Sequence, residues 1–474
     1  KLMSSIDLNN TNKALFKNTG IIAIGQISTK IVNFLLLPLY TALLTTQEYG
    51  LVDILSTYSA LIVVIVGLQI NQAVFRFLVT NRKNKEKLIE ICSTTFFCSV
   101  IICLIYSFAF LIIQYFIPLQ CKWYLLLQVI ATIFLQLISG ITRGLGNNIL
   151  YSFGNFISAF ITIILNVFSI AVFHMGVEMM LIGYIAGPFF GGLIMLYFGK
   201  LYKYIKISFF SFSELKIIIN YSLPLVPNEL SWTLIHSSDR MIVSSILNVA
   251  MNGLIAVASK FSYIYTTVFS IFNTSWTEQV VLHYKDVGGK KYINNMFEKV
   301  VVFFGCLAIG IIASMPLIFK ILVNKQYKTC YGLIPFYMIA VFFNATIGMI
   351  SAIYLAENET KKVAMSTGVA AAINIIVDLV LIRWIGIYAA PISSICGYAF
   401  ITVWRIIDVN RRHCKITMKI KKVVLLFMML LLSLISYWST NTIVNILFLF
   451  IVFIFAILLN KSIIKDLVLS IKKQ

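Results

Sequence analysis

Long apolar runs separated by short polar segments are the dominant pattern along this chain of 474 residues. A helix needs about 20 mostly apolar residues to cross a bilayer. The apolar runs show no strand-like alternation, and helices satisfy their own backbone groups in lipid. The pattern predicts an all-α membrane protein with about 14 transmembrane helices, at 17–43, 51–79, 88–116, 123–143, 149–173, 178–199, 216–240, 249–279, 298–319, 332–356, 363–383, 387–408, 423–439 and 441–460.

The composition supports the same class of protein. Hydrophobic residues make up 60% of the chain, charged residues 12%, and the mean hydropathy is +0.94. A soluble globular protein has about 25% charged residues, so this chain cannot cover a water-facing surface. A soluble globular protein, a disordered protein and a small disulfide-bonded scaffold are therefore excluded. We expect no cleavable signal peptide, because the polar N-terminal segment lacks a short apolar core followed by a cleavage site.

Charge predicts how the chain is oriented. Its 38 Lys and Arg residues exceed its 17 Asp and Glu residues, which gives a net charge of +21. With the N-terminus inside, most cations fall in inside segments, the richest being 405–422, which includes Arg405. The positive-inside rule then places both termini in the cytoplasm. Nucleic-acid binding is disfavoured, because the cations are spread over many loops. The cations that fall outside are Lys122, Lys320, Lys325, Lys328 and Arg383.

Four cations remain once the others are assigned to inside or outside segments, and all four lie inside predicted spans: Lys30, Arg76, Arg240 and Lys260. A charge at membrane depth is costly and normally faces a partner, a cavity or water. Lys30 and Lys260 fall near mid-depth, so we expect them to line a hydrated cavity. Arg76 and Arg240 fall near span ends, where the alternative is that their side chains extend to the membrane interface.

A weak internal repeat indicates two halves. QEYGLV at 47–52 and AMNGLI at 250–255 each open a predicted span, six helices apart. We therefore predict an N-terminal lobe at 1–205, a C-terminal lobe at 206–415, and two extra helices with a basic tail at 416–474. Transporters with such repeats bind substrate where the halves meet.

Two blocks of residues carry a family resemblance. The first is LLLPLYT at 35–41 followed by EYG at 48–50, and the second is YSLPLVPNELSW at 221–232 followed by SDR at 238–240 and ASK at 258–260. These blocks resemble the Wzx-type polysaccharide flippases of the multidrug/oligosaccharidyl-lipid/polysaccharide exporter superfamily. The resemblance implies a two-lobed helical bundle with a cationic cavity. It further implies alternating-access transfer of an undecaprenyl-pyrophosphate-linked oligosaccharide to the outer leaflet of a bacterial plasma membrane.

The resemblance leaves alternatives and further roles open. A flippase for the peptidoglycan precursor lipid II is a close alternative, and a multidrug or cation antiporter of the same superfamily is another. A glycan polymerase complex is a candidate partner beside the lipid-linked glycan and the bilayer. By family analogy, a proton or sodium gradient would drive export. The acids inside predicted spans are candidates for coupling to that ion or for balancing the cations: Asp53, Glu229, Asp239 and Asp378.

Two prolines interrupt the predicted span at 216–240. Proline removes a backbone donor and bends a helix, so Pro224 and Pro227 mark either a hinge or a fixed kink. No phosphate-binding loop or nucleophile elbow appears, and the 4 His and 8 Cys residues show no metal-ligand spacing. We therefore expect a transporter without an enzymatic activity, a cofactor or a metal site.

The orientation predicts which loops a membrane-impermeant thiol reagent reaches in intact cells. In a variant without the native cysteines, Lys325→Cys should be labelled from outside, whereas Lys415→Cys should be labelled only after the cells are permeabilised. The reverse labelling pattern would overturn the predicted orientation.

Overall fold

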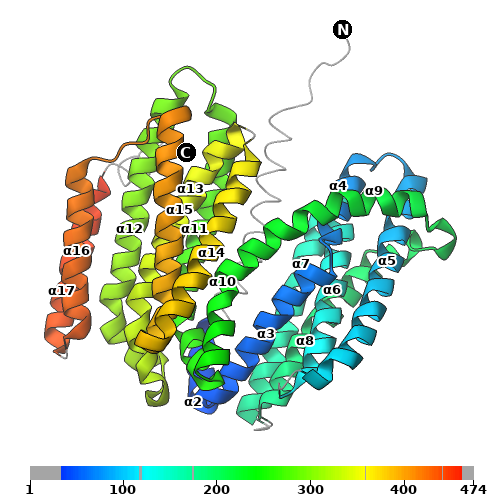
Figure 1. The fold of residues 1–474 in the computed structure, drawn as a ribbon, viewed down its shortest axis with the longest axis horizontal. Helices are drawn as coiled ribbons and strands as arrows, with labels where there is room; N and C mark the ends of the chain where they lie inside the picture. The colour runs from blue at the N-terminus through cyan, green and yellow to red at the C-terminus, as the bar shows by residue number, and fades with distance from the viewer. Residues whose placement is uncertain (1–33, 117–119, 173–175, 358, 440, 462–474) are drawn as a thin grey trace. The chain divides into compact units, whose positions relative to one another are not determined.

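The computed structural model describes residues 34–116, 120–172, 176–357, 359–439 and 441–461 (Figure 1). All regular structure within these ranges is helical. The helices up to the basic central segment are α2 (Leu37–Leu43), α3 (Thr46–Val66), α4 (Ile70–Thr80), α5 (Lys85–Ile113), α6 (Lys122–Gly144), α7 (Asn148–Val167) and α8 (Gly176–Phe198). Those that follow are α9 (Phe212–Ser222), α10 (Val226–Ile246), α11 (Val249–His283), α12 (Gly289–Leu322), α13 (Ile334–Ala356), α14 (Thr360–Ile385), α15 (Ala389–Arg412), α16 (Ile420–Trp438) and α17 (Thr442–Leu459).

Eleven segments of the described chain are long and apolar enough to cross a membrane. One of them, Lys361–Arg412, contains both α14 and α15. With no strand among the described residues, these segments confirm the prediction of an all-helical, multi-pass membrane protein. Most of the first predicted span, 17–43, lies outside the described residues.

The chain divides into two compact units, Lys1–Leu234 and Ile235–Gln474. The division falls within α10, so the last part of this helix belongs to the second unit. The lobes expected at 1–205 and 206–415, with two extra helices at 416–474, stay a prediction.

Small residues bring α7 and α8 together in the first unit. A Cβ atom added to Gly183 would collide with the side chain of Asn166, and one added to Gly187 would collide with that of Thr162. Gly183 and Gly187 are one helical turn apart, as in the small-residue interfaces that allow membrane helices to approach closely. With its nitrogen turned toward α8, the buried amide of Asn166 donates across this interface to the carbonyl of Met180 and, within α7, to the carbonyl of Thr162.

The predicted span at 51–79 is not one continuous helix. The structure ends α3 at Val66 and starts α4 at Ile70. Between them, Leu68 and Gln69 adopt left-handed backbone conformations, with φ angles of 47° and 55°. Two consecutive non-glycine residues in this conformation end the first helix and redirect the second.

In the second unit, α16 is fixed at both of its ends. Near its start, Lys422 forms an ion pair of 2.7 Å with Glu298 on α12. At its end, the Tyr437 ring stacks on Tyr331 with a centroid separation of 4.1 Å, and each hydroxyl donates to the backbone carbonyl of the other residue. Between these points, α16 and α17 pack against α12 (Figure 1).

The position of Arg405 differs from the loop position expected for it. It was expected in the basic segment 405–422, but it lies in α15 and is 1% exposed. Its guanidinium donates to the hydroxyls of Ser351, Ser366 and Thr367 and to the carbonyl of Val363. These neutral acceptors come from α13 and α14, so the buried charge is solvated by dipoles and links three helices.

Replacing Arg405 with Ala should lower the free energy of unfolding by about 2–4 kcal/mol, because it leaves a cavity and removes hydrogen bonds between α13, α14 and α15. Arg411→Ala is the matched control, since Arg411 is exposed on the same helix. Denaturation of the two purified variants in detergent measures the difference. An equal loss in both variants would contradict the role assigned to Arg405.

Candidate functional site

A group of buried polar side chains lies inside the second unit. Asp239 comes from α10, Asn374 and Asp378 come from α14, and Ser394 comes from α15. Their exposed fractions are 6%, 1%, 0% and 7%, respectively. We call these four residues the acidic cluster. Buried ionisable groups in a membrane protein are costly, so they indicate a functional site.

The local sequence explains why α14 and α15 bring these groups together. Asn374 and Asp378 are four residues apart, so they share one face of α14. On α15, Gly397 lies close to that face, since a Cβ atom there would lie 3.0 Å from the backbone oxygen of Ala370. Ser394 lies nearly one turn before Gly397 and therefore reaches the same interface.

Hydrogen bonds through Asn374 connect the three helices. Its Oδ1 accepts a hydrogen bond of 2.9 Å from Ser238, and its Nδ2 donates to Ser393 and Ser394 at 3.2 and 3.3 Å. Ser394 in turn donates to Oδ2 of Asp239 at 2.9 Å. Asn374 thus orients the serine that holds one oxygen of Asp239.

The carboxyl groups of the acidic cluster are incompletely satisfied. Oδ1 of Asp239 and both carboxyl oxygens of Asp378 are buried without a hydrogen-bond partner among the described residues. The two carboxyl groups also interact electrostatically with each other. Arg240 also acts electrostatically on Asp239, so one of the two negative charges is partly compensated, and the other is unfavourable unless a proton or a further cation neutralises it. The arrangement therefore offers oxygen ligands, which hard cations prefer.

A second polar contact between α10 and α15 lies one turn away. His236 Nδ1 is 3.1 Å from the hydroxyl of Tyr398. His236 precedes Asp239 by three residues, and Tyr398 follows Ser394 by four, so both contacts lie along one antiparallel interface.

Two of the predicted cations meet at one aromatic side chain. Arg240 donates to the hydroxyl of Tyr263 at 2.7 Å and to Ser259 at 3.2 Å, both on α11. The ammonium of Lys260 lies 5.5 Å from the centroid of the Tyr263 ring. Arg240, Lys260 and Tyr263 form what we call the cationic cluster. It can bind an anion through charge-assisted hydrogen bonds.

The other predicted cations are not part of the cationic cluster as described. Arg76 belongs to the first unit, is exposed, and lies over the ring of Tyr221 at 4.3 Å. Lys30 lies outside the described residues. The acids Asp53 and Glu229 also belong to the first unit, where both are half-buried.

The structure shows the interruption expected at the two prolines. Pro224 lies in η5 (Leu223–Leu225), a 3-10 helix between α9 and α10, and Pro227 lies in the first turn of α10. Missing backbone donors and fixed φ angles favour a helix start over a continuous helix here. A hinge motion at this point stays a prediction.

Several residues of the two clusters, and several of their hydrogen-bonding neighbours, were not predicted from the sequence. Asp239, Asp378, Arg240 and Lys260 stand out as charges within apolar runs. Ser238, Ser393, Ser394, His236, Tyr263 and Tyr398 do not, because single hydroxyl or imidazole groups are common between membrane helices. The spacing of Asn374 and Asp378 could have predicted a polar site, since it places two polar groups on one face of an apolar helix.

Comparison with known proteins identifies relatives. The sequence profile of the family described as "Polysaccharide biosynthesis protein" matches residues 15–277, more than half of the chain. No curated protein matches the chain significantly.

Solved transporter structures share the fold. The lipid II flippase MurJ in an inward closed conformation has a TM-score of 0.71 and 16% identity, covering 94% of this chain and 99% of that chain. A multidrug resistance MATE family transporter of the MOP superfamily, inward-facing, has a TM-score of 0.69 and 13% identity, covering 82% and 98%. An outward-facing structure of a MATE family transporter has a TM-score of 0.58 and 13% identity, covering 84% of this chain and 95% of that chain. At these identities, the likeness shows a shared fold.

Proposed function

The chain belongs to the polysaccharide biosynthesis protein family, and from this premise we propose that it is a flippase for a polyprenyl-pyrophosphate-linked oligosaccharide. The observation that carries the proposal is the cationic cluster, together with the family match. A pyrophosphate brings negative charge into a region of low dielectric, where fixed cations offset the cost of losing water. Arg240 and Lys260 supply two such cations from one unit, and Lys30 is proposed as a third.

The two other functions expected from the sequence are compatible with the same fold. MurJ is a lipid II flippase, and the MATE structures are those of multidrug resistance transporters. A lipid II flippase would also need cations for a pyrophosphate. A transporter of cationic drugs would instead need an anionic binding surface, which the position of Lys260 beside Tyr263 opposes.

We further propose that the acidic cluster couples export to a cation. Asp239 and Asp378 would hold the transported proton or sodium ion, and Ser394 would position Asp239. Asn374 is proposed to orient Ser394. Loading the site neutralises charge inside the second unit, which gives an energetic difference between the loaded and the empty protein. Pro224 and Pro227 are proposed as the hinge for the accompanying motion, and Asp53 and Glu229 as charge-balancing groups.

Transfer of a labelled undecaprenyl-pyrophosphate oligosaccharide in proteoliposomes tests the substrate. Lys30→Ala and Lys260→Ala should each reduce the initial rate about 10- to 100-fold, the value of one lost charge-assisted contact. Lys260→Arg should retain most of the rate. Lys285→Ala is the matched control, because Lys285 is exposed just beyond the end of α11.

Wild-type rates in both alanine variants would contradict the cationic site. Lipid II serves as the competing substrate in the same vesicles. Faster transfer of lipid II than of the oligosaccharide would favour the precursor flippase.

A gradient assay in the same vesicles tests coupling. Wild-type transfer should accelerate when a sodium or a proton gradient is imposed, each applied separately. Asp239→Asn and Asp378→Asn should remove this acceleration, because an amide takes up no proton and lacks the negative charge that attracts a sodium ion. Asp286→Asn is the control, since Asp286 is an exposed acid outside the predicted spans. Acceleration that persists in both asparagine variants would rule out the acidic cluster as the coupling site.

A further inference from the structure

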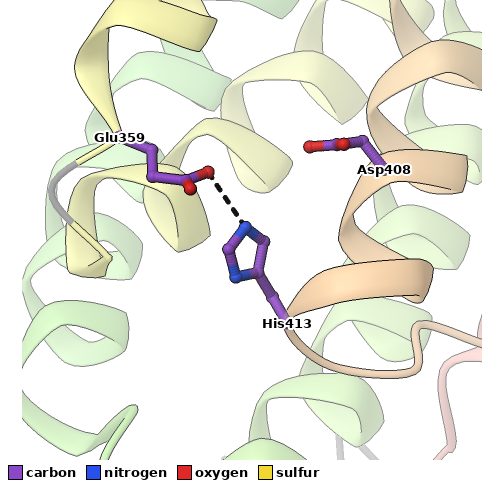
Figure 2. Close-up of side chains that lie close together, drawn as sticks. All are labelled: Glu359, Asp408 and His413. Carbon is purple, nitrogen blue, oxygen red and sulfur yellow. Dashed lines mark hydrogen bonds and ion pairs between the residues drawn. The ribbon is translucent and has the colours of Figure 1, made fainter.

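Three metal-ligating side chains meet at one end of the second unit, away from both clusters along their helices. Glu359 lies just before α14, Asp408 lies in the last turns of α15, and His413 follows the end of α15. One ligand atom from each side chain can be chosen so that all three atoms lie within 4.8 Å of one another. Figure 2 shows that these side chains point toward a common space. Neither the cationic cluster nor the acidic cluster uses them.

The imidazole of His413 is held between carboxylates. Its Nε2 lies 3.1 Å from Oε2 of Glu359, and its Nδ1 lies 3.8 Å from Oε1 of Glu357. The imidazole is 8% exposed, so its orientation is fixed by packing. In protein metal sites, a histidine that ligates through one nitrogen commonly donates its other N–H to a carboxylate. Glu357 lies on the Nδ1 side, where a shift of less than about 1 Å would bring it into hydrogen-bond distance for that outer role, while Nε2 faces Glu359.

Asp408 is also oriented from outside the group. The hydroxyl of Tyr354 donates to Oδ2 of Asp408 at 2.8 Å. The ring of Tyr354 packs edge-on against His413, with a centroid separation of 5.9 Å. One tyrosine of α13 therefore positions two of the three ligand groups, as supporting residues around metal sites do.

Two cations neutralise the carboxylates in the structure. Lys362 pairs with Glu359, and Arg412 pairs with Asp408 at 3.0 Å. Both cations are more exposed than their partners, with side chains 35% and 57% exposed, and each sits within one turn of its acid. Such ion pairs contribute little to stability, so a bound dication can displace them.

We propose that Glu359, Asp408 and His413 bind a divalent first-row transition-metal ion of the zinc type. A set of one imidazole and two carboxylates suits zinc, whereas magnesium and calcium prefer oxygen ligands alone. Zinc bonds to nitrogen and oxygen are about 2.0–2.2 Å long, so the ligand atoms move inward on binding. To ligate the ion, Nε2 must carry no proton, so the neutral imidazole holds its single proton on Nδ1, on the side of Glu357, and any second proton is released to solvent.

Zinc binding to the full-length protein in detergent, purified without a histidine tag and stripped with a chelator, tests the proposal independently of transport. We expect one zinc ion per chain, and binding about 100-fold or more weaker in His413→Gln, Glu359→Gln and Asp408→Asn. Glu357→Gln should weaken binding about 10- to 100-fold, as loss of an outer partner does. Lys362→Gln should strengthen it, because the competing ammonium is removed from Glu359.

His283→Gln is the matched control. His283 forms an exposed pair with Asp286 at 2.7 Å, and no third ligand group completes it within the described residues. This variant should bind zinc like the wild type. Absence of zinc binding in the wild type, equal binding in His413→Gln, or equal binding of magnesium would overturn the proposal. Should the ligand variants fail to fold, the opposite effects expected for Glu357→Gln and Lys362→Gln still decide it.

Discussion

The structure depends on one constraint, which is that the bilayer cannot solvate the ionised side chains inside its helices. An apolar chain in a bilayer has no water to stabilise a buried ion, so each ion inside the helices must find protein dipoles, an opposite charge, an aromatic ring or a mobile ion. The second unit shows several of these solutions side by side. Arg405 is surrounded by hydroxyl and carbonyl oxygens, and Arg240 and Lys260 share Tyr263. Asp378 has neither of its carboxyl oxygens satisfied among the described residues.

This difference separates buried ionisable groups that the protein satisfies from those that it leaves unsatisfied. The guanidinium of Arg405 is fully engaged by groups that belong to the protein, so it needs nothing from outside and holds three helices together. Of the four carboxyl oxygens of Asp239 and Asp378, three are buried without a hydrogen-bond partner in the part of the chain that the structure describes. A buried group that the protein leaves unsatisfied costs free energy, and that cost is recovered when a ligand supplies the missing partner.

Helix positions and the charges within them could be predicted from the sequence, because a bilayer imposes a length and a polarity on every crossing segment. The break after Gly67 could not, because Leu68 and Gln69 are ordinary residues for a helix and only the packed structure shows their left-handed conformations. Arg405 was misplaced because its hydroxyl partners lie on other helices.

Most residues that contact the charged groups could not be predicted either, because they too lie on other helices. Ser394 reaches Asp239 across 155 positions of sequence, and His413 reaches Glu359 across 54. Spacing rules for metal sites and hydrogen-bond motifs search short distances along the chain, so contacts made by helix packing escape them. Charges within spans could be read directly because their cost does not depend on which helix packs beside them.

The two units treat comparable helix pairs differently. In the first unit, α7 and α8 meet through glycines around Asn166, whose amide hydrogen-bonds to backbone carbonyls. In the second unit, α14 and α15 meet through Gly397 and serines around Asn374, and α14 adds Asp378 one turn further on. The sequence of α7 contains no acid. A close helix interface with a central asparagine is thus present in both units, and it acquires an ionisable group in the second. Because a neutral amide changes no charge when a cation binds, this asymmetry supports the proposal that the acidic cluster, rather than the Asn166 interface, couples export to a cation.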